Sequence, residues 1–510
     1  MDPYEIVPYG SRPYAEAHPD RLCVVGRLFG LCPPDPATAR VLELGCGAGL
    51  HLAPIAARLP GSRCVGVDRN PAAIARARGT AAQLGASNLT FVEADLCAAD
   101  PPLADATLPD AYDYVIVHGV YSWVPAEVRD AILARCARWL APTGIAYVSY
   151  NTRPGWQLRG MLAEMLQFHA EGFEAPEKKV AQSRALLQFL AEAVPDSEPY
   201  GAWLRREARL VAAQPDAWVF HDLLAHENAA VLVSEFVAHA RAHGLQYLGD
   251  ADLPSMLPDR LPPTVRRVLD TLGSDLVRLE QYLDFVVCRN FRRSLLCRPG
   301  VEIDRDLAWP RLEGAWLRGP VESLGVDDAG GEVFRTRAGD TLSTTVPSLR
   351  AAFEILADAD PAPIAFDALV SEASARAGST TERFDRELIG RNLLLCFARG
   401  VLEVLPREIA VARTLAPRPV ADPVIRALAV GGEGVPSLLH EHVPIDAIDR
   451  SLLPRLDGTR TVAALIDELG RAVDGGALVA PSDRDRVSSF LAEAVPDRLQ
   501  RYLRAGLLSA

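Results

Sequence analysis

A glycine-rich turn between a strand and a helix constrains the fold of this chain more than any other stretch. Val41, Leu42 and Leu44 form a short apolar run that predicts a buried strand, and Gly45-Cys46-Gly47-Ala48-Gly49 ends it abruptly. A helical pattern follows over residues 50–59. Glycines are needed in such a turn because the backbone takes positive φ angles and a ligand lies close to it. Strand, turn and helix together predict the start of a doubly wound, nucleotide-binding α/β sheet.

The glycine spacing and the acid before it argue against a dinucleotide ligand. The fingerprint G-x-G-x-x-G requires a glycine at position 50, where this chain has Leu50. Glu43 would repel a phosphate, but it suits a ligand that carries a cationic amine. S-adenosylmethionine (SAM) has such an amine and a sulfonium, and it has no phosphate. The turn therefore favours SAM as the cofactor.

Acidic residues also close the next two predicted strands. Residues 63–68 predict a strand that ends in Asp68, whose carboxylate can accept hydrogen bonds from both ribose hydroxyls. The segment 89–95 predicts a further strand with Asp95 just past its end, where it is placed to bind the adenine amino group. Ligands bind at the carboxyl ends of parallel strands, so one cofactor site is expected there. Its predicted residues are Glu43, Gly45, Cys46, Gly47, Asp68, Asn70, Asp95, Leu96 and His118.

Two further strands and several helices complete the alternating pattern. Strands are expected at 112–118 and 144–150, with helices at 71–84 and 126–140 between the strands. The whole series resembles the class I SAM-dependent methyltransferases. That resemblance implies a Rossmann-like sheet with two more strands after the fifth, for which 245–248 and 293–297 are candidates.

The rest of the chain predicts a helical insertion and two smaller modules. Helical patterns cover 157–170, 176–193 and 199–213, whereas residues 301–345 carry only short strands or loops. Two segments, 347–405 and 422–510, each end in a helix, a glycine and a short apolar run, as in winged-helix-like modules. The second segment includes a predicted helix at 452–469. The expected domains are 1–155 (SAM-binding), 156–300 (helical middle or regulatory region), 301–415 and 416–510 (C-terminal modules).

Charge and cysteine content limit which kinds of partner and which cellular compartment are expected. The net charge of −13 and the lack of a Lys/Arg-rich recognition helix argue against nucleic-acid binding. Nine cysteines without a C-x-x-C pair are typical of a reduced, cytoplasmic protein. No signal peptide or membrane insertion is expected from the sequence. The C-terminal modules suit docking or dimerisation, so a homodimer is an open option.

Linking motifs narrow the family. Several segments resemble a bacterial group of methyltransferases with a methyltransferase regulatory domain, which includes the rickettsial protein-lysine methyltransferases that act on outer-membrane proteins. The resemblance covers most of the chain, but it does not extend to residues 301–345. The segments that carry it are 9–14, 18–22, 118–125, 149–156, 226–228, 245–251, 281–285, 291–296, 439–443 and 456–460.

The methyl acceptor is expected just past the fourth strand. Tyr121 and Trp123 lie there, and Tyr9 and Tyr150 could complete an aromatic cage for a cationic group. The predicted catalytic residues are accordingly Tyr9, His118, Tyr121 and Trp123. His118 is a candidate base or cofactor contact, although a strand-end histidine is more often a structural hydrogen-bonding residue.

The tyrosine-rich N-terminal twenty residues fit two alternatives. They form either a lid that brings Tyr9 or Tyr14 to the sulfonium, or an arm that packs on the sheet without touching a ligand. No metal is expected, because His221 and His226 lack the i, i+4 spacing of a metal-binding helix and His440 and His442 suit a surface.

Three functions stay open. The resemblance implies a protein-lysine methyltransferase. A small-molecule methyltransferase of secondary metabolism is the second hypothesis, and a non-enzymatic SAM-binding docking protein is the third. The sequence from 118 to 121, His-Gly-Val-Tyr, differs from the D/N-P-P-Y turn of methyltransferases that act on nucleobase amino groups.

Overall fold

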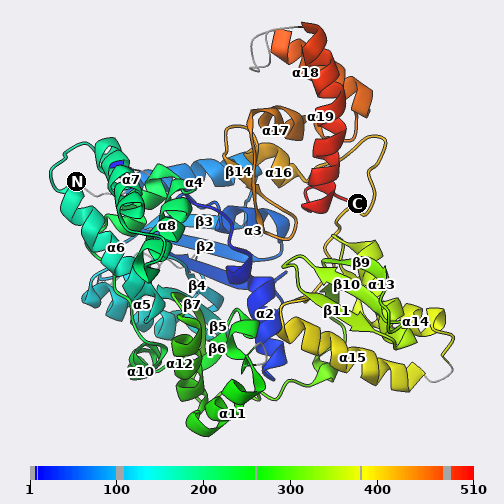
Figure 1. Ribbon diagram of the computed structural model, residues 1–510, viewed down its shortest axis with the longest axis horizontal. Coiled ribbons are helices and arrows are strands. Elements are labelled where there is room, and N and C mark those ends of the chain that lie inside the picture. Colours follow the sequence, from blue (N-terminus) through cyan, green and yellow to red (C-terminus); the bar gives the residue numbers. More distant parts are fainter. Residues whose placement is uncertain (1–5, 8–9, 99–107, 259–260, 380–381, 475–483) are drawn as a thin grey trace.

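The computed structural model describes residues 1–510 except 1–5, 8–9, 99–107, 259–260, 380–381 and 475–483. Its centre is a seven-stranded sheet in the order β3-β2-β1-β4-β5-β7-β6 (Figure 1). The strands are β1 (Arg40–Leu44), β2 (Arg63–Asp68), β3 (Leu89–Glu93), β4 (Tyr112–Val117), β5 (Leu140–Asn151), β6 (Gln246–Asp250) and β7 (Phe291–Cys297). Strands β1 to β5 pair in parallel, and β7 is antiparallel to β5 and β6. The expected doubly wound sheet is confirmed, including its two late strands.

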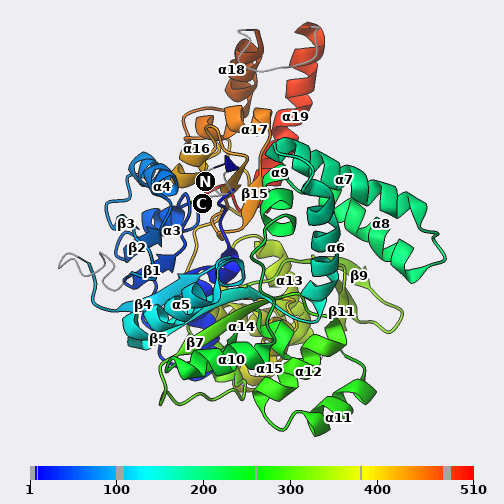
Figure 2. The same ribbon diagram turned by 90° about the vertical axis from the view of Figure 1, so that its left-hand side faces the viewer.

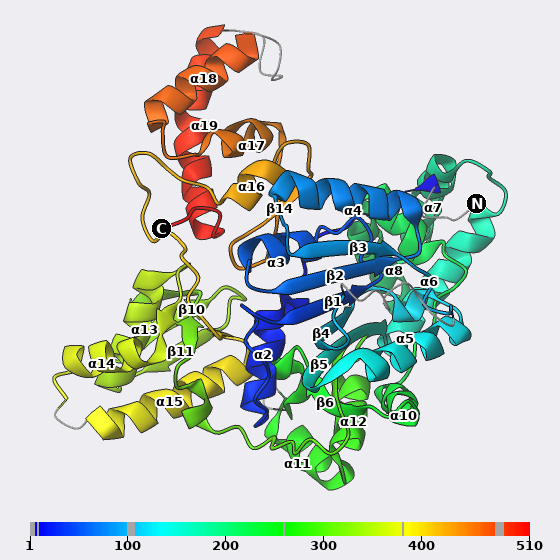
Figure 3. The same cartoon turned by 180° about the vertical axis from the view of Figure 1, so that it is seen from behind.

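Helices cover both faces of this sheet because its strands are apolar on both sides. On one face, α2 (Pro19–Leu28), α3 (Leu52–Arg58) and α4 (Pro71–Leu84) share a core with alternate strand residues such as Val41 and Ile116. On the other, α5 (Ala126–Trp139) and α10 (Val233–Ala242) pack on the intervening residues, such as Leu42 and Val115. The result is a three-layer α/β/α domain (Figure 3).

The helical insertion stands between β5 and β6. It consists of α6 (Gly155–Ala170), α7 (Pro176–Ala193), α8 (Pro199–Ala212), α9 (Asp216–Trp218) and the π-turn η4 (Val219–Leu223), which share one small core. Figure 2 shows it as a group of helices beside the sheet. The chain then returns through α10, β6, η5 (Leu253–Met256), α11 (Pro263–Leu272) and α12 (Leu276–Val287) to β7. The middle region therefore completes the central sheet.

The third part of the chain contains two small sheets and three helices. Strands β9 (Val321–Val326), β10 (Glu332–Thr336) and β11 (Thr341–Thr344) form an antiparallel meander. Strand β8 (Trp316–Arg318) pairs with β12 (Ile364–Ala365) and β13 (Glu403–Leu405) beside α13 (Pro347–Ala359), α14 (Phe366–Arg376) and α15 (Glu382–Ala398). The short turn η7 (Trp309–Leu312) leads into it.

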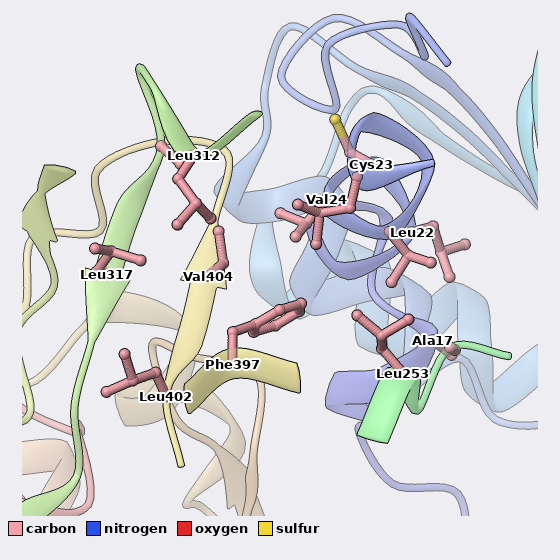
Figure 4. Close-up of a cluster of buried hydrophobic side chains, with 14 of the residues drawn as sticks. Ala17, Leu22, Cys23, Val24, Leu253, Leu312, Leu317, Phe397, Leu402 and Val404 are labelled. Atoms are coloured by element: carbon pink, nitrogen blue, oxygen red, sulfur yellow. The ribbon is translucent and has the colours of Figure 1, made fainter. Parts of the chain in front are cut away.

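This third part shares a core with the catalytic domain. Helix α2 is buried along most of its length, with Leu22 and Val24 close to Leu253 of η5 and Phe397 of α15 (Figure 4). His18 caps the helix by accepting a hydrogen bond from Asp20 N at 3.1 Å, and Pro19 occupies its first turn. An N-terminal helix thus joins two regions that are distant in sequence.

The last part contains α16 (Pro423–Leu428), β14 (Gly434–Pro436), β15 (His442–Pro444), α17 (Ala447–Leu452), the turn η8 (Leu453–Arg455), α18 (Val462–Asp474) and α19 (Arg484–Arg504). The helix expected at 452–469 was wrong as a single element. Pro454 lies in η8 and Gly458 takes a φ of 81°, so the chain turns before α18 begins.

Candidate active site

The glycine turn after β1 has the positive φ angles that its sequence predicts. Gly45, Gly47 and Gly49 take φ angles of 77°, 53° and 74°. The amides of Gly45 and Cys46 both donate to the carbonyl oxygen of Val67, at 2.7 and 3.0 Å, which fixes the turn against the end of β2. A Cβ atom on Gly47 would meet no protein atom within 4 Å, so the turn faces open space at this residue. A ligand can therefore approach the backbone here.

Two carboxylates border this space. Glu43 is buried at the end of β1, and its Oε2 has no hydrogen-bond partner among the described residues. Burial and the nearby charge of Asp68 raise the pKa of Glu43 well above its usual range. A buried carboxyl oxygen without a partner is costly, and a cationic amine would both pair with it and restore its charge. The residue therefore fits the ammonium group of SAM.

Asp68 ends β2 beside the glycine turn. Its Oδ2 accepts a hydrogen bond from the Gly47 amide at 2.9 Å, and its Oδ1 accepts one from the Asn70 amide at 2.9 Å. Each carboxylate oxygen has a second lone pair that can accept a bond from a ribose hydroxyl. Asp68 thus both orients the turn and offers acceptors to the ligand.

The other predicted cofactor residues lie at neighbouring strand ends. The side chain of Asn70 caps α4 by accepting from the amides of Ala72 and Ala73, at 2.9 and 3.0 Å. Asp95 is exposed just past β3, and Leu96 next to it is buried. Asn70 therefore shapes the site through its cap, whereas Asp95 keeps a carboxylate open to an adenine amino group.

His118 lies at the end of β4 under the N-terminal arm. Its Nδ1 is 2.9 Å from the hydroxyl of Tyr147, and its ring lies 3.6 Å from the ring of Tyr14, centroid to centroid. Burial lowers the pKa of His118 to about 3, and the cations Arg293 and Arg12 contribute in the same direction. The imidazole is therefore neutral at physiological pH and only weakly basic.

The N-terminal arm crosses the carboxyl ends of the strands. The Tyr14 amide donates to His51 Nδ1 at 3.3 Å, and further upstream the Val7 carbonyl oxygen is 2.6 Å from His221 Nε2 in η4. Burial raises the pKa of the Tyr14 hydroxyl, and the charges of Glu43 and Asp222 act in the same direction. Tyr9 lies outside the described residues.

The aromatic cage expected from sequence does not assemble from Tyr121, Trp123 and Tyr150. Tyr121 and Tyr150 are buried together against Phe236 of α10, on the far side of β4 and β5 from Tyr14. Trp123 packs edge-on against Trp156, with ring centroids 5.8 Å apart. Alternation along β5 explains the orientation of Tyr150, which faces α10 and not the arm.

Sequence reasoning missed partners from distant segments. Phe291, at the start of β7, packs edge-on against His118 with centroids 6.1 Å apart. Asn151 closes β5 and donates from Nδ2 to Asn228 Oδ1 at 3.1 Å, which joins the strand end to the middle region. Their positions could have indicated both residues, because Asn151 directly follows the strand expected at 144–150 and Phe291 shortly precedes the one expected at 293–297.

Three histidines, His18, His51 and His440, form a buried seam between the cofactor turn and the last part of the chain. His51 lies two residues after the glycine turn, and its Nδ1 is 2.9 Å from His440 Nε2. The ring of His18 lies 4.9 Å from that of His440. Nearby, Arg58 of α3 pairs with Asp422 at 3.0 Å. We call His18, His51 and His440 the histidine seam.

The comparisons with known proteins agree with this architecture. Three family models match: "Methyltransferase domain" over residues 41–144, "Predicted methyltransferase regulatory domain" over 215–298, and "PKMT, C-terminal winged helix domain" over 417–507. Protein RP789 of Rickettsia prowazekii is 31% identical over 96% of this chain and 89% of its own length.

A solved structure matches the whole chain. PKMT2 from Rickettsia typhi, in complex with S-adenosylhomocysteine (AdoHcy), aligns with a TM-score of 0.88 and 27% identity, covering 98% of this chain and all of that one. PKMT2 without that ligand aligns with a TM-score of 0.87. The winged-helix prediction is therefore confirmed for the last module. The sheet order, the glycine turn and these matches show that the chain belongs to the same family as RP789, a family of SAM-dependent methyltransferases with a class I catalytic domain, a regulatory domain and a C-terminal winged-helix domain.

Proposed function

We propose that this methyltransferase N-methylates lysine side chains of a protein substrate. The observation that carries the proposal is the match to PKMT2, a rickettsial protein-lysine methyltransferase, over the whole chain and not only over the catalytic sheet. The resemblance extends to the middle region and the winged-helix domain, which lie beyond the catalytic core that small-molecule methyltransferases share.

Different residues of the site would bind different parts of the cofactor. SAM, when bound, supplies an electrophilic methyl group on a positively charged sulfur. Glu43 would pair with its ammonium group, Asp68 with the ribose hydroxyls and Asp95 with the adenine amino group. The glycine turn lets the ligand lie against the backbone. Fixing the methyl donor in this way supplies most of the catalytic gain, because methyl transfer depends on alignment.

Tyr14, His118 and Phe291 would form the acceptor side. An in-line attack needs a neutral lysine amine, whose ordinary pKa is about 10.4. With a pKa of about 3, His118 is too weak a base to take that proton. We infer instead that this buried, neutral aromatic surface lowers the pKa of the lysine by desolvation and orients its amine. Asp222 near Tyr14 is the carboxylate that would attract the substrate cation.

A labelled-methyl experiment tests the acceptor class. The enzyme is given SAM with a radiolabelled methyl group and a lysine-rich unfolded protein, or the same protein with its lysines chemically acylated. The expected result is label in the unblocked protein only, recovered after acid hydrolysis at the positions of methyl-lysine standards. Equal labelling of the blocked protein, or transfer only to a panel of small organic acids and amines, would favour the small-molecule hypothesis.

Asp68→Ala tests the cofactor assignment separately. Two hydrogen bonds to a carboxylate are worth roughly 3 kcal/mol together, so SAM should bind about 100-fold more weakly by calorimetry. Asp358→Ala, which removes an exposed carboxylate of α13, serves as the control and should bind like wild type. Unchanged affinity in the Asp68 variant would contradict the proposed ribose contact.

We also infer a homodimer built on the helical insertion. Large apolar side chains are exposed on α6 to α8, with Phe168 81% and Phe189 62% accessible. Such a surface favours burial against a second copy. Light scattering should show a dimer that Phe168→Ser/Phe189→Ser converts to a monomer. Phe384→Ser, which changes a similarly exposed phenylalanine of α15, should leave the mass unchanged.

The cysteines support a reducing compartment, which we propose to be the cytoplasm. All nine are free in the structure, and Cys23, Cys64 and Cys136 are buried in the catalytic core as small apolar residues. None of the helices in the described part of the chain has the length and apolar character needed to cross a bilayer.

A further inference from the structure

Three metal-binding side chains converge where the catalytic domain meets the middle region. Asp130 lies on α5, and His239 and His243 lie on and just after α10. One ligand atom from each residue comes within 4.8 Å of the other two. His239 Nε2 is 2.6 Å and His243 Nε2 is 3.7 Å from the same carboxylate oxygen, Asp130 Oδ1. We call these three residues the α5–α10 triad.

The histidine spacing is the one that places two imidazoles on one helix face. Residues four apart lie one above the other on a helix, and the two rings are 5.1 Å apart. Ligand atoms of a tetrahedral zinc site are roughly 3.4 Å apart, because each lies about 2.1 Å from the ion. The observed distances of 2.6 and 3.7 Å lie on either side of this value. Asp130 is 60% exposed, so its carboxylate can shift to meet an ion.

A second contact supports His239 from behind. Its Nδ1 is 2.7 Å from the hydroxyl of the buried Tyr121. Metal-binding histidines usually use their other ring nitrogen in this way, and the contact fixes both the tautomer and the ring orientation. Tyr121 therefore has a role in the structure, although it does not face the arm and Tyr14.

We propose that the α5–α10 triad binds a divalent cation of the zinc class, with water in the fourth position. Without the ion, His239 would donate a hydrogen bond from Nε2 to Asp130 and accept one at Nδ1 from the Tyr121 hydroxyl. With the ion, Nε2 would become a ligand and the ring proton would move to Nδ1, which would then donate to the Tyr121 oxygen. The ring proton is kept, so this rearrangement releases none.

The bound ion would clamp α10 onto α5 and hold the segment that follows β4. Tyr121 lies in that segment, and the neighbouring Val120 lies against the cofactor turn, since a Cβ on Gly45 would come within 2.4 Å of its side chain. Two residues, Tyr121 and Val120, thus connect the triad to the glycine turn. The cation is expected to stabilise this contact between the two regions.

No local sequence motif predicts the triad. His239 and His243 have i, i+4 spacing, unlike the pair His221 and His226. Their carboxylate partner Asp130 lies 109 residues before His239, so no local motif contains all three. Only the packing of α10 beside α5 joins them.

Zinc titration of the full chain tests the proposal. After chelator treatment, calorimetry with Zn²⁺ should show one saturable site per chain that depends on the triad. His243→Ala and Asp130→Asn should each weaken it on the order of 100-fold. Tyr121→Phe keeps all three ligands and loses only the supporting hydroxyl, so a smaller loss, at least tenfold, is expected. Circular dichroism establishes that each variant is folded.

A control separates the triad from other surface groups. His169→Ala removes a histidine of α6 that lies 3.4 Å from Gln182, and it should leave zinc affinity unchanged. Zinc should also raise the melting temperature of wild type and the His169 variant, but not of His243→Ala. No saturable binding, or binding that His243→Ala and Asp130→Asn leave intact, overturns the proposal and reduces the triad to an ion pair.

Discussion

The histidine seam predicts that acid loosens the docking of the winged-helix domain. His18, His51 and His440 are held neutral by burial, which lowers the pKa of His18 to about 4 and those of His51 and His440 well below their usual value. The hydrogen bonds agree, because His51 Nδ1 accepts from both His440 and the Tyr14 amide, and His18 Nδ1 accepts from Asp20 N. A proton on either acceptor nitrogen would break these bonds.

The size of the effect follows from proton linkage. An unfolded histidine has a pKa of 6.5, so between that pH and the lower folded pKa the unfolded chain binds more protons. The free energy of unfolding therefore falls as the pH falls below 6.5. At about pH 5 each seam histidine lowers the free energy of unfolding by about 2 kcal/mol, and all three lower it by about 6 kcal/mol. Above pH 7 the penalty disappears.

Urea denaturation at about pH 7.5 and about pH 5, on wild type and His440→Gln, measures this effect. Asp250, whose pKa burial raises to about 6, contributes with the opposite sign, so the difference between the two proteins is the decisive quantity. The pH-dependent loss should be about 2 kcal/mol smaller in the variant. His226→Gln, at an exposed histidine, is the control. An equal loss in wild type and His440→Gln would refute the buried, neutral seam.

Two further substitutions test the packing around the site. Gly49→Ala should lower stability by about 2 kcal/mol in thermal melts, because its φ is 74° and a Cβ would lie 2.6 Å from Phe91. The control Gly79→Ala, in α4 with open space around it, should be neutral or stabilising. Equal melting temperatures of the two variants would contradict the clash. Arg292→Met should cost about 3–5 kcal/mol in urea, because the fully buried carboxylates Glu280 and Asp284 would lose their cation. An equally stable Met variant would refute the expected loss.

Much of the catalytic domain could be predicted because its signals are local. The helices at 71–84 and 176–193 match α4 and α7, since each begins with a proline in its first turn and has a regular apolar face. The glycine turn and the acids at the strand ends likewise predict the cofactor side of the site from short stretches of sequence. Even the late strands β6 and β7 are visible as apolar runs.

The acceptor side could not be predicted because its partners come from distant segments. Tyr14, His118 and Phe291 meet only after the arm, β4 and β7 have come together. Tyr121 follows His118 by three residues, yet it packs on the α10 side, and the sequence around it does not reveal that orientation. The roles of the individual site residues stay predictions. So do the domain boundaries, although β6 and β7 join the middle region to the catalytic sheet.

That shared sheet has a consequence for how the chain matures during synthesis. Strand β5 is twelve residues long, and its neighbour β7 leaves the ribosome only after the insertion and the rest of the middle region. Until then, β5 presents an unpaired edge at the side of an otherwise apolar sheet, which is a template for misassembly. We expect nascent chains that stop between β5 and β7 to need a chaperone, and truncations after residue 155 to aggregate where the full chain does not.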